Sequence, residues 1–360
     1  MARAYEPIER ILVINPGATS TKFAVYDGEI LVFKKTVEHS AADTDVFVKV
    51  IDQYEYRLRL ILQQLIVENI ELSTLKAVVA RGGILKPLKG GTYGISQTMV
   101  NDLREAARGE HASNLGAVMA YGLAETLKIP SYIVDPVSVD EMEPVARISG
   151  LPEIPRISLL HALNTKAVAR KIAKQLGKKY EDMNLIVAHL GTGISVTPHL
   201  KGRMIDVNNA KEEGPLSPDR CGGLPVGQFL RFAFSGKYTF DELKEILNCK
   251  GGIWAYLGTA DIRKAFAMAD SGNELARLVL EAFSYQVAKE IGGMATVLSG
   301  NVERIILTGG IAYSERIVSD IKKRVQFIAP VVIVPGEEEL EALAFGALRV
   351  LRGKEDVQSY

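Results

Sequence analysis

The segment NPGATSTK, from Asn15 to Lys22, follows a short apolar run and holds small hydrogen-bonding side chains, one glycine and one cation. Backbone N–H groups in a glycine-containing turn suit phosphate oxygens, and a lysine neutralises phosphate charge. Asn15 is a side chain that can bind an oxyanion or a metal-bound water. The P-loop order GxxxxGK[ST] is absent. The turn, with Gly17, Ser20 and Lys22, is a candidate phosphate site. A hairpin turn with a purely structural role is the alternative.

Two further glycine turns follow apolar runs. In HLGTGIS, His189 precedes Gly191 and Gly193, and glycines after a strand allow a close approach of a ligand to the backbone. This segment lacks GxGxxG and a following helix, which argues against a Rossmann dinucleotide site. In LTGGIAYSE, Gly309 and Gly310 separate a predicted strand from a predicted helix, where a nucleoside can pack against backbone. For both turns, the alternative is an ordinary connecting loop with no ligand.

Single charged and titratable residues add to these turns. Arg81 stands at a predicted strand end, and Arg220 lies in the Pro- and Gly-rich loop PLSPDRCGGLP. Guanidinium groups stabilise the charge on a transferring phosphoryl group, although a surface arginine is the default. His111 and His161 are candidates that a core or surface role would also explain. The acidic run 337–339 suits metal or water positioning, or simply the start of a helix.

Composition limits the classes of function. The chain has 360 residues, for which two domains are expected. Lys plus Arg and Asp plus Glu number 43 each, so no bulk attraction to nucleic acid or to an anionic membrane is expected. Two cysteines, the lack of an apolar signal-type N-terminus and the lack of an apolar run of ~20 residues favour a reduced, cytoplasmic protein. The histidine spacing predicts no zinc site.

The two halves of the chain repeat one pattern. A strand over residues 11–14 leads to Asn15-x-Gly17, and a hairpin glycine, Gly28, follows eleven residues after Gly17. In the second half a strand leads to His189-x-Gly191, and Gly202 follows eleven residues after Gly191. The pattern predicts hairpins turning at Asp27-Gly28 and Lys201-Gly202. Two such units predict duplicated domains with a nucleotide between two lobes. Helices are expected near residues 47–68, 96–109, 114–129, 165–177, 226–235, 239–248, 274–299, 311–325 and 337–353.

Together these segments resemble one family. VINPGATSTK, EHASNLGA, HLGTGIS, LTGGIAYSE and PGEEELEALAFGALRVL are similar to segments of the acetate and butyrate kinases, and most to the butyrate kinase branch. The resemblance covers nearly the whole chain. It implies an α/β fold with two duplicated ribonuclease-H-like lobes around a nucleotide cleft, as in the actin-like ATPases. The expected lobes are residues 1–148 plus 340–360, with the C-terminal helix packed back, and a nucleotide-binding lobe of residues 149–339.

The resemblance also implies an activity and residue roles. The family transfers the γ-phosphoryl group of ATP to a carboxylate, giving acyl phosphate and ADP, with Mg²⁺. Oligomers, commonly homodimers, are usual in the family; no nucleic acid or membrane partner is expected. The implied catalytic residues are Asn15, Arg81, Asp135, His161 and Arg220, and the implied metal-associated residues are Asn15 and Glu338. The implied phosphate and nucleotide residues are Gly17, Ser20, Lys22, His189, Gly191, Thr192, Gly193, Asp261, Arg263, Gly309 and Gly310. His111 and Leu160 are the implied substrate residues.

Departures from the acetate kinase pattern bear on the substrate. Arg81 stands where that pattern has histidine, and Val78 stands where it has the arginine. Leu160 replaces a phenylalanine before His161, and the loop leading to Arg220 is shorter. Both changes predict a roomier acyl pocket, and each added buried methylene is worth ~0.8 kcal/mol. We therefore expect butyrate or a branched C4–C5 acid as substrate. An acetate or propionate kinase, a sugar kinase of the same superfamily and a nucleotide-gated binding protein remain alternatives.

Overall fold

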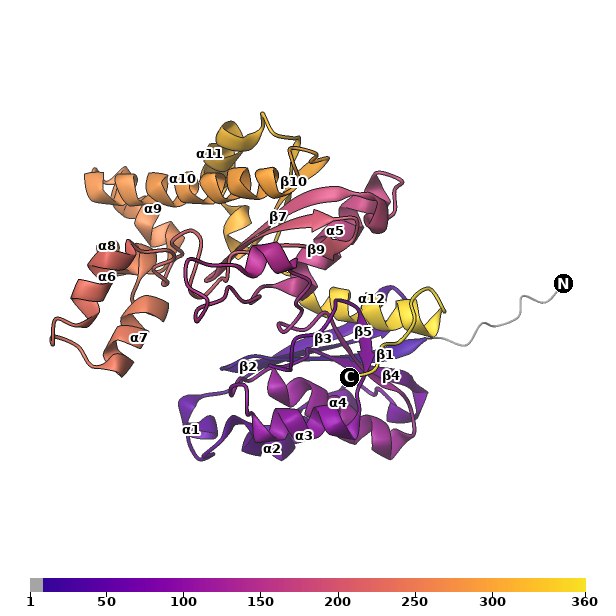
Figure 1. Cartoon of the computed structure of the whole chain (residues 1–360). Coiled ribbons are helices and arrows are strands. Elements are labelled where there is room, and N and C mark those ends of the chain that lie inside the picture. The colour runs from indigo at the N-terminus through magenta and orange to yellow at the C-terminus, as the bar shows by residue number, and fades with distance from the viewer. Residues whose placement is uncertain (1–8) are drawn as a thin grey trace. The chain divides into compact units, whose positions relative to one another are not determined.

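The computed structural model describes residues 9–360. The prediction that the N-terminus lacks a signal-type apolar segment concerns residues 1–8 in part, and these lie outside the described residues. The chain divides into two compact units (Figure 1). Unit 1 takes the chain up to Val139 and again from Glu338 to Tyr360, and unit 2 takes Asp140–Glu337. The first observed boundary, at 139/140, lies nine residues before the predicted boundary at 148/149. The second, at 337/338, lies two residues before the predicted boundary at 339/340.

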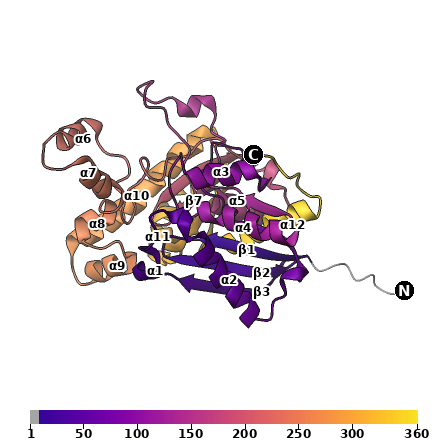
Figure 2. The same ribbon diagram turned by 90° about the horizontal axis from the view of Figure 1, so that it is seen from below.

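Unit 1 is built on a six-stranded mixed sheet of order β3-β2-β1-β4-β6-β5. Strands β1, β4 and β6 are parallel, and β2, β3 and β5 run antiparallel to their neighbours. Figure 2 shows β1, β2 and β3 side by side. The strands are β1 (Arg10–Pro16), β2 (Ser20–Asp27), β3 (Ile30–Glu38), β4 (Leu75–Ala80), β5 (Thr92–Gly94) and β6 (Ser131–Val134).

Helices cover both faces of the unit 1 sheet, with α2, α3 and α4 on one face and α12 on the other (Figure 1). Leu12, Ile14 and Phe23 alternate with residues of the opposite face and pack with Ile61 and Leu65 of α2. The helices are α1 (Ala41–Thr44), α2 (Tyr54–Val67), α3 (Gln97–Glu105), α4 (Asn114–Leu127) and α12 (Glu339–Leu351), with 3₁₀ turns at Val50–Gln53 and Leu72–Thr74.

Unit 2 is built on a five-stranded sheet of order β11-β10-β7-β8-β9. Strands β7, β10 and β11 are parallel, whereas β8 and β9 are antiparallel. The strands are β7 (Asn184–Leu190), β8 (Ile194–Leu200), β9 (Arg203–Met204), β10 (Arg304–Gly309) and β11 (Val331–Pro335).

The β7 side chains of unit 2 alternate between two cores. Ile186 and Ala188 pack with α10 and α11, whereas Leu185 and Val187 pack with α5. Because β7 is buried on both faces, its central residues 185–188 form a continuous apolar run without polar alternation. The helices are α5 (Ala162–Gln175), α6 (Val226–Ala233), α7 (Phe240–Asn248), α8 (Gly252–Leu257), α9 (Ile262–Asp270), α10 (Glu274–Val297) and α11 (Glu315–Val325), with 3₁₀ turns at Pro144–Arg147, Tyr180–Asp182 and Gly310–Tyr313.

The predicted duplication appears in the strand order. In each unit the first strand pairs antiparallel with the second, the second pairs with the third, and the first pairs in parallel with the fourth. The turn at Lys201-Gly202 is where the pattern predicts it, with φ of 47° and 83°. The turn predicted at Asp27-Gly28 instead uses Gly28 and Glu29, because Asp27 still pairs with Ile30. In the part of the chain that the structure covers, no helix combines the length and apolarity needed to span a bilayer.

Candidate active site

In unit 1 the candidate residues gather at one edge of the sheet. Asn15 lies near the end of β1, Arg81 directly follows β4, and Asp135 directly follows β6. These three strands are parallel, so their carboxyl ends meet at the same edge. Ligands of open α/β sheets bind outside this edge. The sequence-predicted residues of unit 1 are therefore brought to the side of the sheet where a ligand is expected.

A carboxylate from the last helix joins two of these residues. Asn15, which is 5% exposed, donates a hydrogen bond from Nδ2 to Oε2 of Glu339 at 2.6 Å. Arg81 Nη1 lies 3.1 Å from Oε1 and 3.2 Å from Oε2 of the same carboxylate. The structure thus places Glu339, at the start of α12, beside Asn15 and Arg81. Glu338, the predicted metal-associated residue, is the exposed residue that precedes this helix.

Asp135 has a different environment. It is 1% exposed and adopts a left-handed backbone with φ of 38°, which is uncommon for a residue with a side chain. Its Oδ1 accepts a hydrogen bond from Gly91 N at 2.7 Å, and its own N–H donates to Gly91 O at 3.0 Å. These bonds hold the chain just before β5. The geometry gives Asp135 a structural task, and its catalytic role stays a prediction.

The turn between β1 and β2 carries the predicted phosphate residues. Gly17 N–H donates to Ser20 O at 2.7 Å, which closes the turn. Lys22 stands opposite Asn15 in the β1–β2 ladder, and its side chain is exposed. Ala18 and Thr19 at the tip are exposed as well. Solvent-facing backbone and a nearby lysine are what a phosphate site requires.

His39 adjoins this turn through a buried hydrogen bond between its Nε2 and Thr21 Oγ1 at 2.8 Å. Burial, and then the positive charge of Arg57, lower the pKa of His39 from 6.5 to about 4.

This shift makes the stability of the fold depend on pH. Between about pH 6.5 and pH 4 the unfolded chain takes up a proton at His39 and the folded chain does not, so the free energy of unfolding falls as the pH falls through this window. We expect His39→Gln to flatten that fall when urea unfolding is followed from pH 7 to pH 4. The buried His199, whose pKa is also lowered by burial, keeps part of the slope in the variant. Parallel curves for the variant and the original chain would contradict the assignment.

His111 is held beside α4. Its Nδ1 accepts a hydrogen bond from Ser113 N–H at 3.1 Å and lies 2.7 Å from Ser113 Oγ. Desolvation, followed by the positive charge of Arg81, lowers the pKa of His111. The positive charge of Arg81 therefore acts on the His111 imidazole, and the substrate role of His111 stays a prediction.

In unit 2 the candidate glycines also gather at the carboxyl ends of parallel strands. His189 pairs with Thr308 of β10, and Gly309 pairs with Pro335 of β11. A side chain at Gly309, where φ is 88°, would come within 2.4 Å of Leu190 O, so this position requires glycine. Gly310, in contrast, faces open space. At this edge the backbone is therefore close-packed at Gly309 and accessible at Gly310, and an accessible backbone suits a ligand that packs against it.

Two histidines stack at this edge. The rings of His161, at the start of α5, and His189 lie 3.9 Å apart with 13° between their planes. His161 Nδ1 is 2.8 Å from Ser195 Oγ, and His189 Nδ1 is 2.8 Å from Asn164 Oδ1. Because Asn164 Oδ1 accepts, Nδ1 of His189 carries the proton. Each ring is fixed by a hydrogen bond and by its neighbour.

The second ring nitrogen of His189 faces the glycine turn. His189 Nε2 is buried, without a hydrogen bond of good geometry, although Glu337 Oε1 lies 3.0 Å away. A side chain at Gly191 would come within 3.0 Å of this nitrogen. Thr192, the next residue, is exposed at the tip of the turn. Leu160, predicted to line the substrate site, is 4% exposed beside His161.

Arg220 reaches the same turn from its loop. Its Nη1 donates to Ala210 O at 2.9 Å, and a side chain at Gly193 would come within 2.5 Å of that nitrogen. The loop itself is fixed, because Arg220 N–H donates to Ser217 Oγ and Gly251 N–H donates to Asp219 O. The structure thus brings the guanidinium to the HLGTGIS turn, and glycine at position 193 leaves room for it.

Asp261 and Arg263 pair with each other. Asp261 caps α9 by accepting from Arg263 N–H, and its Oδ2 lies 2.8 Å from Arg263 Nη2. Hydrogen bonds from the Arg263 side chain and backbone lower the pKa of Asp261 to about 2. The Arg263 side chain is 91% exposed. A contact of this pair with nucleotide stays a prediction.

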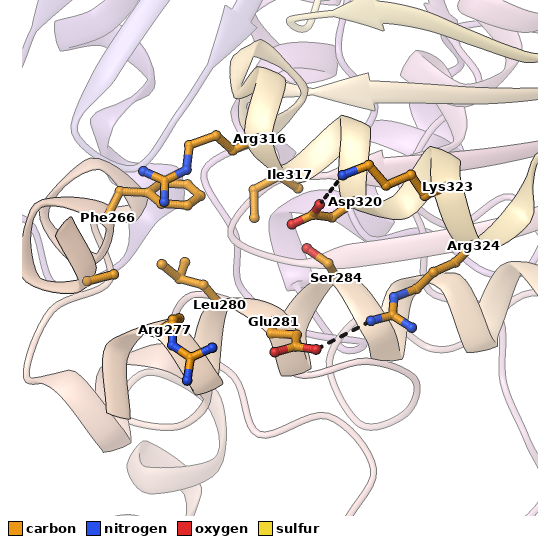
Figure 3. A pocket seen from close by; sticks show the side chains of 11 residues that line it. Phe266, Arg277, Leu280, Glu281, Ser284, Arg316, Ile317, Asp320, Lys323 and Arg324 are labelled. Atoms are coloured by element: carbon orange, nitrogen blue, oxygen red, sulfur yellow. Dashed lines mark hydrogen bonds and ion pairs between the residues drawn. The ribbon is translucent and has the colours of Figure 1, made fainter. Parts of the chain in front are cut away.

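A pocket of about 410 Å³ lies elsewhere in unit 2, among α9, α10 and α11 (Figure 3). None of the predicted site residues lines it. Each of its cations has an acidic neighbour: the pairs are Arg277 with Glu274, Arg316 with Asp270, Lys323 with Asp320 and Arg324 with Glu281. Each of these cations is therefore paired with a carboxylate, which weakens the attraction of the pocket for an anion.

The chain is similar in sequence and in fold to known short-chain carboxylate kinases. The acetokinase family model matches residues 156–332. Butyrate kinase 1 of Clostridium acetobutylicum is 53% identical over 352 residues, which is 98% of this chain and 99% of that protein. An acetate kinase structure from Porphyromonas gingivalis has a TM-score of 0.75 at 18% identity, covering 95% of this chain and 100% of its own. A propionate kinase structure from Francisella tularensis has a TM-score of 0.73 at 20% identity, covering 94% and 98%.

Proposed function

The chain belongs to the acetokinase family, and from this we propose that it is a butyrate kinase, which transfers the γ-phosphoryl group of ATP reversibly to butyrate or a branched C4–C5 acid. The observation that carries the proposal is the 53% identity, over 98% of the chain, to a protein named Butyrate kinase 1. The two sheet edges support it, since each gathers residues suited to phosphate.

In the proposed reaction a carboxylate oxygen attacks the γ-phosphorus in line, and the bond to the β-phosphate oxygen breaks. The protein has little covalent chemistry to perform, so positioning and charge stabilisation dominate. Arg220 stabilises the charge on the equatorial oxygens, and His161, fixed by Ser195 and by its stack on His189, orients the same group. Lys22 and the N–H groups of the β1–β2 turn bind phosphate.

The oxygen atoms available as ligands in unit 1 suit Mg²⁺. The ion prefers oxygen ligands and keeps several waters. Asn15 donates from Nδ2 to Glu339, which leaves its amide oxygen for a hydrated cation, and the carboxylates of Glu338 and Glu339 are adjacent in the chain. Bound Mg²⁺ would neutralise phosphate charge. Glu339 would hold Asn15 and Arg81 in place beside it.

Chain-length preference is tested by acyl hydroxamate formation with ATP, Mg²⁺ and hydroxylamine across acids from formate to hexanoate. We expect the highest kcat/KM at C4–C5, because Leu160 and the short loop before Arg220 predict a roomy apolar pocket. A peak at acetate would leave a carboxylate kinase but overturn this view of the pocket. No product with any acid, with ATP still bound, would favour a sugar kinase or a nucleotide-gated binder.

We also propose that the protein is a cytoplasmic homodimer or larger homo-oligomer. Exposed apolar side chains occur from the start of α6 to the start of α7, with Val226 80%, Phe234 84% and Phe240 79% exposed. Such a patch marks a contact surface. Both cysteines are free thiols, as in a reducing compartment. A monomeric mass by light scattering would contradict the oligomer, and activity in a membrane or secreted fraction would contradict the location.

A further inference from the structure

Arg57 is a charged residue in the middle of an apolar helix face. Helix α2 buries Arg57, Ile61 and Leu65, which are spaced four residues apart on one side. Arg57 is 1% exposed and is the largest fully buried side chain among the described residues. Guanidinium groups are rarely buried this completely unless they are paired.

The guanidinium donates hydrogen bonds to carbonyl oxygens of the β1–β2 turn. Nη1 donates to Gly17 O at 2.8 Å and to Ser20 O at 3.2 Å, and Nη2 donates to Ala18 O at 3.1 Å. Gln53, one helical turn earlier, accepts from Nε at 2.9 Å and from Nη2 at 2.7 Å. One side chain therefore gathers the carbonyls of three turn residues.

This arrangement fixes the direction of the turn's N–H groups. In a trans peptide the N–H points away from the preceding carbonyl. Because the carbonyls of Gly17 and Ala18 point at Arg57, the N–H groups of Ala18 and Thr19 point the other way. No acceptor for either N–H occurs in residues 9–360, and both residues are exposed. Two aligned, unused donors form an anion-binding concavity.

The charge of Arg57 has no carboxylate partner within the described chain; its acceptors are carbonyls, Gln53 and Thr21 Oγ1. A buried charge without a counterion is unfavourable, and burial lowers the pKa of Arg57. A phosphate at the turn would supply the missing negative charge.

We propose that Arg57 is a positioning residue that prepares the β1–β2 turn for nucleotide phosphates and adds a fixed positive charge behind it. The inference rests on the proposed function, in which this turn binds phosphate. Arg57 does not touch the nucleotide in this scheme; it acts through the backbone of residues 17–20.

The test compares ligands that differ in their phosphates. Binding of ADP, AMP and adenosine is measured by calorimetry for the original chain, Arg57→Met, Arg57→Lys and the control Ile61→Ala. We expect Arg57→Met to weaken ADP binding about 10-fold to 100-fold and adenosine binding less than about twofold. Arg57→Lys keeps the charge with fewer hydrogen bonds, so its loss of ADP affinity should be intermediate. Ile61→Ala removes a buried side chain from the same helix face and should lower stability without changing the ratio of ADP to adenosine affinity.

The outcomes separate the inference from the function on which it rests. An unchanged ratio of ADP to adenosine affinity in Arg57→Met would overturn the positioning role. If the methionine variant does not fold, the same result in Arg57→Lys would overturn it. Failure of the original chain to bind ADP or to form acyl phosphate would overturn the proposed function, and the inference with it. In the kinase assay we expect the KM for ATP to rise in both Arg57 variants, with the KM for butyrate unchanged.

Discussion

Arg220→Ala should lower kcat for acyl phosphate formation by about three to five orders of magnitude, while ADP affinity changes less than about threefold. The guanidinium is held at the HLGTGIS turn by Ala210 O and by the fixed loop behind it. Because the group is already in position, little free energy is spent on reorganisation when charge develops on the phosphoryl oxygens. It therefore stabilises the transition state more than the bound substrates. Hydroxamate formation gives kcat, and calorimetry gives ADP affinity.

Arg231→Ala is the matched control, because Arg231 is an exposed arginine of α6. It should retain nearly full activity. Near-normal kcat in Arg220→Ala would remove Arg220 from the mechanism. An equal loss of kcat and of ADP affinity would instead mean that Arg220 binds ground-state phosphate.

Glu339→Gln should lower kcat/KM about 100-fold to 1,000-fold, whereas Glu338→Gln should change it less than about threefold. Glu339 is the carboxylate that accepts from Asn15 and pairs with Arg81. Removal of its charge leaves the half-buried Arg81 unpaired and frees the Asn15 amide to turn. Glu338 makes no such contact within the described chain and is exposed.

The pair of variants decides between two assignments. The family resemblance implies a metal-associated role for Glu338, whereas Glu339 is the carboxylate that contacts Asn15 and Arg81. A large loss in Glu338→Gln with an active Glu339→Gln would support the assignment from sequence. Both variants keep the size of the side chain, and thermal unfolding distinguishes a folding defect from lost chemistry.

Much of the fold could be predicted from sequence because local patterns determine it. The paired glycine turns predicted two similar units, and the first four strands of each unit have the same order. The helix predicted from residue 96 is observed as α3, where Ser96 is the N-cap and its hydroxyl accepts from Met99 N–H. Helices α8 and α9 were not predicted, since α8 has only six residues and a glycine follows it. The cap of α9, Asp261, was a signal that could have revealed that helix.

The candidate site was harder to predict where side-chain direction decides. Consecutive residues at a helix start point about 100° apart, so the sequence could not show which of Glu338 and Glu339 faces Asn15. Arg57 was missed because its spacing to Ile61 and Leu65 indicates an ordinary amphipathic helix. A cation within an apolar stripe was the available signal.

The position of α12 in unit 1 has a consequence for biosynthesis. This helix comes from the end of the chain, yet it packs tightly on the unit 1 sheet, where a side chain at Gly346 would come within 2.4 Å of Val134. During translation the first 139 residues therefore emerge long before the helix that covers one face of their sheet and supplies Glu339. Unit 2 can complete its core first, even though its sequence follows. The nascent N-terminal segment carries an uncovered apolar sheet face until Glu339–Leu351 has emerged, and this is the stage at which chaperone binding would matter most.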